Sequence, residues 1–65
     1  MTLEEALNKS AKEVSCVAVI NLIIQSGSCS AGAYHRDKGR FYPESIKKTL
    51  AEQVLECLKW CNGET

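Results

Sequence analysis

The feature that most constrains this chain is an apolar stretch, residues 17–24, which only Asn21 interrupts. The chain has 65 residues, and a domain of this size buries only about 60% of the surface of its unfolded chain. The stretch is far too short to cross a bilayer. It must therefore be sheltered by a thin core or by a second chain.

The apolar stretch continues a helical pattern that begins at the start of the chain. Thr2 and Glu5 have the spacing of a capping box, in which each side chain bonds the backbone amide of the other residue. The apolar positions that follow recur at steps of three and four residues: Leu3, Leu7, Ala11, Val14, Ala18 and Leu22. This phase predicts one helix over residues 2–25, although the density of β-branched residues also permits a buried strand.

The middle of the chain has the composition of a connector, residues 26–42. Residues 26–33 are small and flexible, which predicts a loop. Residues 34–42 flank Asp37-Lys38-Gly39, a sequence that suits a short β-hairpin with Gly39 in the left-handed conformation. Both an irregular loop and such a hairpin are compatible with this segment.

A second helix is predicted over residues 43–61. Pro43 suits a first helical turn, and Asn62-Gly63 suits a helix end. The stripe of this helix is Ile46, Leu50, Val54, Cys57, Leu58 and Cys61. The expected fold is therefore a single, mainly all-α domain, an antiparallel helical hairpin.

One neighbouring helix cannot cover a helix that is apolar around most of its circumference. Leaving side chains such as Val19, Ile20 and Ile23 in water would forfeit roughly 1.5 to 3 kcal/mol each. We therefore expect a homodimer resembling a four-helix bundle, or a higher oligomer. The expected interface residues are Val17, Val19, Ile20, Ile23, Ile24, Leu50, Val54, Cys57 and Leu58.

Charge and the first residues predict a soluble, cytoplasmic chain without a membrane partner. Eight basic residues balance eight acidic residues, so no overall field draws the chain to nucleic acid or to an anionic membrane. The polar, acidic start does not resemble a secretion signal.

The four cysteines are interpreted mainly as small buried hydrophobes. The alternatives are a disulfide between Cys16 and Cys57, and a zinc site in which Cys29 and His35 join Cys57 and Cys61. In a helical hairpin these two pairs lie about 20 Å apart. We therefore expect no metal and no other cofactor.

Catalysis is not expected either. The potential nucleophiles Ser28, Cys29 and Ser30 share a flexible segment with the lone histidine, and nothing rigid orients them. The glycines match neither a Walker loop nor a dinucleotide-binding motif.

The candidate partner-binding site combines cations and aromatic rings within residues 34–42. Its residues, with the tryptophan near the chain end, are Tyr34, His35, Arg36, Lys38, Arg40, Phe41, Tyr42 and Trp60. A protein partner is the main hypothesis, and nucleic acid or nucleotide binding, with phosphates on the cations and bases on the rings, is the alternative. The structural alternative is that the rings plug the open end of the bundle, with Trp60 against Leu3 and Leu7.

In its length, its capped Thr2-Leu3-Glu4-Glu5 start and its lack of catalytic motifs, the chain resembles the small helical accessory proteins of temperate bacteriophages. The resemblance implies a regulator, inhibitor or adaptor that binds a host or phage factor in the host cytoplasm. It implies no site residue.

Overall fold

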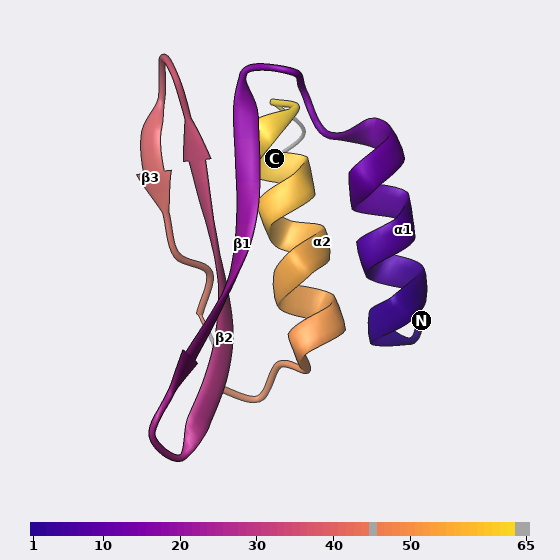
Figure 1. Cartoon of the computed structure of the whole chain (residues 1–65), viewed down its shortest axis with the longest axis vertical. Helices are drawn as coiled ribbons and strands as arrows, with labels where there is room; N and C mark the ends of the chain where they lie inside the picture. Colours follow the sequence, from indigo (N-terminus) through magenta and orange to yellow (C-terminus); the bar gives the residue numbers. More distant parts are fainter. Residues whose placement is uncertain (45, 64–65) are drawn as a thin grey trace.

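The computed structural model describes residues 1–44 and 46–63 and shows a small α+β fold. The order of elements is α1 (Leu3–Glu13), β1 (Ala18–Gln25), β2 (Ser28–His35), β3 (Gly39–Phe41) and α2 (Leu50–Cys61). The strands form an antiparallel sheet in the order β1-β2-β3, and both helices lie on one side of it (Figure 1). The prediction of a mainly all-α helical hairpin that dimerises into a four-helix bundle is therefore wrong.

Helix α1 begins where the capping box predicts. The Glu5 amide donates to Thr2 Oγ1 over 3.2 Å, and the Thr2 amide donates to Glu5 Oε1 over 3.0 Å. The helix ends at Glu13 because Val14 is extended, with φ −65° and ψ 141°. The side chain of Asn62 holds this exit: it donates to Glu13 O over 2.9 Å and accepts from the Ser15 amide over 3.1 Å. Helix α1 is therefore eleven residues long, and the helix predicted over residues 2–25 does not continue past Glu13.

The apolar stretch is strand β1, not helix. Its β-branched side chains have few rotamers in a helix and pack well on a pleated sheet. A turn at Ser26-Gly27, where Gly27 has φ +78°, leads into β2. The register runs from Ala18 opposite His35 to Gln25 opposite Ser28. The strand alternative, and not the helix, describes this part of the chain.

Strand β2 occupies most of the segment predicted to be a loop. Its small residues do pack a core: Ala31 and Ala33 are only 2% and 4% exposed and belong to the cluster that α2 completes. Past the end of β3, the Ala31 amide donates to the buried side chain of Gln53 over 3.1 Å. Small side chains therefore let α2 approach the sheet closely enough for Gln53 to bond the Ala31 amide, which β3 does not reach.

The turn from β2 to β3 lies within the segment for which a hairpin was considered. Tyr34 pairs with Arg40, and His35 pairs with Gly39. Gly39 has the left-handed φ, +89°, that the sequence predicts.

Helix α2 begins at Leu50, seven residues later than predicted. Lys47 has a left-handed φ of 64°, which no continuous helix allows. A second capping box, between Thr49 and Glu52, starts the helix instead. Ile46, expected on the helical stripe, lies before the helix and is 68% exposed.

The rest of the stripe forms the core of this chain. Val54 and Cys57 are fully buried, and Leu58 is 3% exposed. These three residues were expected in an interface between copies, but they are already enclosed within one copy. No helix of the described residues has both the length and the apolar composition to span a membrane.

Candidate functional site

Strand alternation divides residues 34–42, the aromatic-basic segment, between the two faces of the sheet. Neighbouring side chains on a strand point to opposite faces. Tyr34 and Arg40 are paired and share the outer face, while the next residues along each strand, His35 and Phe41, point towards α2. The eight predicted site residues therefore do not form one surface.

The inward half of the segment is assembled around Trp60. The ring of Phe41 stacks on Trp60 with centroids 5.2 Å apart and planes at 12°, and His35 meets it edge-on at 6.3 Å. Lys38 Nζ lies 5.6 Å from the Trp60 ring centroid and donates to the Trp60 carbonyl over 2.8 Å. This cluster attaches the β2–β3 turn to the last turn of α2, so Trp60 serves the fold.

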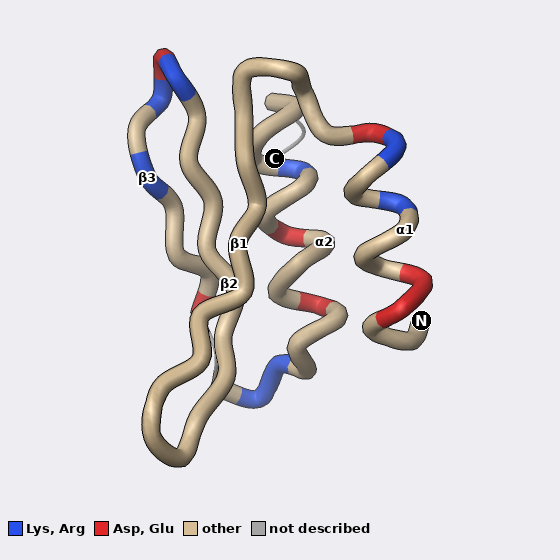
Figure 2. Tube along the Cα trace, in the orientation of Figure 1, with Lys and Arg blue, Asp and Glu red and all other residues tan. Residues whose placement is uncertain are grey.

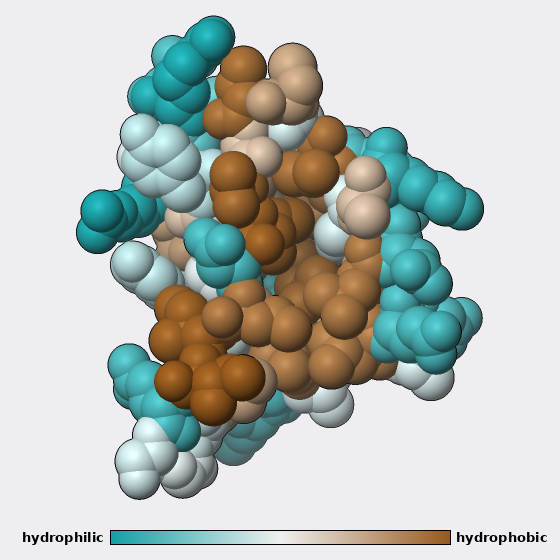
Figure 3. Space-filling view, viewed as in Figure 1, coloured by the Kyte–Doolittle hydropathy of each residue, from teal (hydrophilic) through white to brown (hydrophobic). Residues whose placement is uncertain are grey.

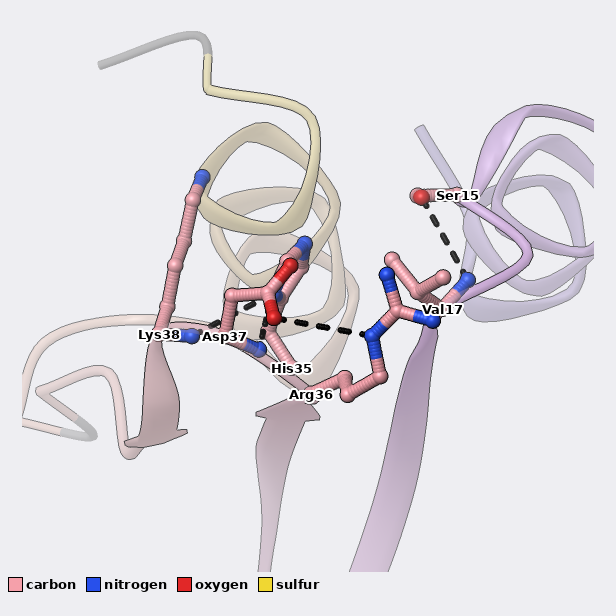
Figure 4. A network of polar contacts seen from close by, with 6 residues as sticks. All are labelled: Ser15, Val17, His35, Arg36, Asp37 and Lys38. Carbon is pink, nitrogen blue, oxygen red and sulfur yellow. Dashed lines mark hydrogen bonds and ion pairs between the residues drawn. The ribbon is translucent and has the colours of Figure 1, made fainter.

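His35 shapes the turn. It is 8% exposed, and its Nδ1 accepts from the Asp37 amide over 3.0 Å and from the Lys38 amide over 3.3 Å (Figure 4). In the same view Arg36 reaches the carboxylate of Asp37, with 3.5 Å between Nε and Oδ1. The ring nitrogen that faces the backbone is thus an acceptor within the turn, and the ring does not point into a ligand site.

Of the three cations in this segment, two have partners within the chain. Arg36 faces Asp37, and Lys38 is held on Trp60. Within residues 1–44 and 46–63, Arg40 is the one cation of the three that makes no ion pair, side-chain hydrogen bond or cation–π contact. Arg36, Lys38 and Arg40 are therefore not arranged together as three free cations that would bind a phosphate chain.

The outward half of the segment borders a hollow on the uncovered face of the sheet. Tyr34 is 46% exposed and Tyr42 is 61% exposed. The hollow has a volume of about 340 Å³. We call its walls the tyrosine face, which comprises Asn21, Ile23, Gly32, Ala33, Tyr34, Arg40 and Tyr42.

Gly32 makes room for the tyrosine face. A Cβ atom at this position would lie 3.0 Å from both Cδ1 and Cε1 of Tyr42 and 3.2 Å from Cδ1 of Ile23. The Tyr42 ring therefore rests directly on the backbone of the central strand.

Charge is nearly absent from this part of the molecule. Residues 14–35 contain no Lys, Arg, Asp or Glu, and the tube of Figure 2 is uncoloured along β1 and β2. Arg40 is the single charged residue among those that line the hollow. The arrangement can therefore stack flat groups on two phenol rings, bury apolar groups on Ile23 and hold one anion.

The two buried thiols, Cys57 and Cys61, are poor nucleophiles and poor metal ligands. Burial, together with nearby Cys61 and Glu56, raises the pKa of Cys57 to about 12. Burial also raises the pKa of Cys61, although Lys38 opposes that change. All four cysteines are free, so the considered Cys16–Cys57 disulfide is not formed. Within the described residues, no three His, Cys, Asp or Glu side chains are grouped as a metal site.

Sequence reasoning missed Asn21, Gly32 and Ala33 as site residues and placed Ile23 in a helical interface. The period-two pattern of β1 contains the missing information, because Val19, Asn21, Ile23 and Gln25 all share one face of a strand.

No family model, curated protein or solved structure matches this chain.

Proposed function

We propose that this chain is a non-enzymatic binding protein that recognises a protein partner through the tyrosine face. The observation that carries the proposal is the hollow on the uncovered side of the sheet, with two half-exposed tyrosines beside a single arginine. Tyrosine and arginine are enriched among the residues that dominate binding energy in interfaces, and lysine and glutamate are depleted there. The tyrosine face has this composition.

The distribution of cations favours a protein over a nucleic acid. Binding to a phosphate chain relies on several basic side chains that track the backbone. On the tyrosine face Arg40 is the single cation, because neither Arg36 nor Lys38 lines the hollow and Lys38 is bound to the Trp60 carbonyl. The two exposed rings keep single-stranded nucleic acid as the second candidate, since every base can stack on a tyrosine.

A regulatory or adaptor role is consistent with the lining of the tyrosine face, which offers two phenol rings and one cation for binding and no group of catalytic side chains. This role agrees with the resemblance to small bacteriophage accessory proteins, which act by binding a host or phage factor.

The proposal is tested by affinity capture with the wild type and with a variant that carries Tyr34→Ser, Arg40→Ser and Tyr42→Ser. The lysate comes from cells of the organism that carries the gene. A partner that contacts the tyrosine face should be captured by the wild type and lost from the triple variant. The matched control carries Glu4→Ser, Asn8→Ser and Lys12→Ser on exposed positions of α1 and should retain the partner.

The two candidate functions differ in their response to salt. Fluorescence anisotropy with a single-stranded oligothymidylate should show no binding that the triple variant abolishes. Binding that weakens steeply with salt, and that the triple variant loses, would establish the nucleic-acid alternative instead. Equal capture of the same proteins by the wild type and by the triple variant would contradict the tyrosine face as the site.

A further inference from the structure

Strand β1 is a long and unprotected edge of the sheet. It pairs with β2 on one side, and no strand of the described residues pairs with its other side. Edge strands of natural proteins are usually short or carry charges, prolines or bulges that prevent pairing with another chain. This edge is eight residues long, Ala-Val-Ile-Asn-Leu-Ile-Ile-Gln, with neither a charge nor a proline.

The phase of the β1–β2 ladder identifies the backbone groups at the open edge. The Arg36 amide donates to Val17 O over 3.0 Å, and residues that exchange hydrogen bonds alternate along an antiparallel pair. Residues 19, 21, 23 and 25 are therefore bonded to β2. The amides and carbonyls of Ile20, Leu22 and Ile24 point away from β2.

The same three residues carry an apolar surface towards the side of the helices. The β1–β2 hairpin extends beyond α2, which leaves Leu22 41% exposed and Ile24 81% exposed (Figure 1). Figure 3 shows a continuous hydrophobic surface from this hairpin across the molecule towards α1. The open edge thus combines unpaired backbone groups with exposed apolar side chains.

A hollow beside this edge extends the apolar surface to α1. Its volume is about 160 Å³, and its lining residues are Leu7, Ser10, Ala11, Val14, Ile20 and Val54. Ser10 is 6% exposed, and its hydroxyl has no hydrogen-bond partner among the described residues. Ile20, on the face of β1 that points towards the helices, is the one residue of β1 among those that line this hollow.

We propose that a second copy of this chain pairs with β1 in antiparallel register, with a two-fold axis at Leu22. Ile20 then lies opposite the partner's Ile24, and Leu22 lies opposite the partner's Leu22. This register uses all three open residues of each strand. It also brings the partner's Ile24, the most exposed apolar side chain of the hairpin, next to Ile20 and the hollow at α1.

The sequence of β1 suits pairing with itself. On the outer face this register places Val19 opposite the partner's Gln25, and Asn21 opposite the partner's Ile23, so no charges meet. Two copies form one six-stranded sheet with all four helices on one side, because the axis is perpendicular to the sheet. The register places Asn21 and Ile23 of the tyrosine face at the interface, but Tyr34, Arg40 and Tyr42 lie away from the paired edge. Dimerisation is therefore tested separately from partner binding.

A charged residue introduced at Leu22 tests whether the two-fold axis lies there. Sedimentation velocity of the purified wild type at micromolar concentration should show a dimer. Leu22→Lys places two lysines opposite each other, and Leu22→Glu places two glutamates opposite each other. Each variant alone should be monomeric, with dimerisation weakened roughly 100-fold or more. An equimolar mixture of the two variants should form a heterodimer, because the opposite charges then meet.

Two further variants separate edge pairing from a general loss of stability. Ile24→Pro removes an amide hydrogen from the open edge, where a proline fits, and should abolish dimerisation. Ile24→Thr removes the same apolar side chain but keeps the amide, so it should retain a weaker dimer. Ser28→Lys adds a charge at an exposed position of β2, away from the open edge, and should dimerise like the wild type. Circular dichroism verifies that each variant is folded.

A folded wild-type monomer at micromolar concentration would overturn the proposal. Dimers that persist in both Leu22 variants would also overturn it, as would a mixture of the two variants that stays monomeric. Equal dimerisation of Ile24→Pro and Ile24→Thr would show that the edge amides take no part in pairing.

Discussion

A step of one residue along β2 or β3 moves a side chain from the tyrosine face to the core. Tyr34 and Arg40 are exposed, while His35 and Phe41 contact Trp60. The sequence places these residues close together, and their composition alone resembles one basic-aromatic site. Their function depends on the parity of the strand, which is set by the pairing of β2 with β3.

Gly32→Ala tests how closely the Tyr42 ring depends on the central strand. Gly32 does not have a left-handed φ, so alanine suits its backbone, but the new Cβ would lie 3.0 Å from the ring. Tyr42 is largely exposed and can move, so we expect the free energy of unfolding to change by no more than about 1 kcal/mol. The NMR signals of the Tyr42 ring should shift, and the Trp60 indole signal should stay in place. An unchanged Tyr42 ring would contradict the contact.

The pKa of Cys57 predicts a loss of stability in alkali. Its pKa is raised from 9.0 in an ordinary thiol to about 12, so the unfolded chain loses its proton first as the pH rises. The stabilisation is complete below about pH 9 and is lost between pH 9 and pH 12. At about pH 10 the loss is roughly 1 kcal/mol relative to about pH 8.

Urea unfolding at the two pH values measures this effect. Cys57→Ala should be less stable at both values and should show a smaller loss in alkali. Cys16→Ala, at an exposed thiol, should follow the wild type. Identical alkaline losses in the wild type and in Cys57→Ala would refute the assignment.

Among the helices and strands, the sequence predicted one helix start and one turn, both of which depend on local chemistry. Thr2 and Glu5 start α1, and Gly39 takes the left-handed conformation in the turn before β3. The apolar run at residues 17–24 was mistaken for helix because a short run fits both periods. Whether the run forms a helix or a strand depends on its pairing with β2. The small residues of β2 indicate a strand only in combination with α2, which covers them.

The candidate site was likewise predicted only where it depends on local sequence. Tyr34, Arg40 and Tyr42 were named from composition, but their separation from His35, Lys38, Phe41 and Trp60 requires the strand parity. The Thr49–Glu52 capping box was present in the sequence with the same spacing as the first one. Pro43 was preferred as a helix start, and the left-handed backbone of Lys47 could not be foreseen from a lysine.

Both capping boxes should contribute measurably to stability. Thr2→Ala and Thr49→Ala each remove a hydroxyl that accepts from the amide three residues later, over 3.2 Å in both cases. The expected loss is about 1 kcal/mol for each variant in urea unfolding. Thr2→Ser and Thr49→Ser keep the hydroxyl and should stay close to the wild type. Equal losses for serine and alanine would exclude capping as the cause.

In the whole molecule, α2 joins parts that are distant in the sequence. It packs against the sheet and against α1, and its last turn holds the β2–β3 turn through Trp60. In the proposed dimer the tyrosine faces of two copies lie on the same side of one sheet. A partner would then meet two equivalent hollows, which would strengthen binding if it engages both.

Asn62, the residue that caps the end of α2, should fix the position of the segment that follows α1. Its side chain donates to Glu13 O and accepts from the Ser15 amide, so one residue satisfies two backbone groups of the link between α1 and β1. Asn62→Ala should cost about 1 to 2 kcal/mol in urea unfolding. Hydrogen exchange should speed up at Ser15.

Asn62→Asp separates the two bonds, because a carboxylate accepts from Ser15 but cannot donate to Glu13. We expect its stability to lie between those of the wild type and Asn62→Ala. If Asn62→Ala unfolds like the wild type and leaves exchange at Ser15 unchanged, α1 is held by its packing against α2 alone.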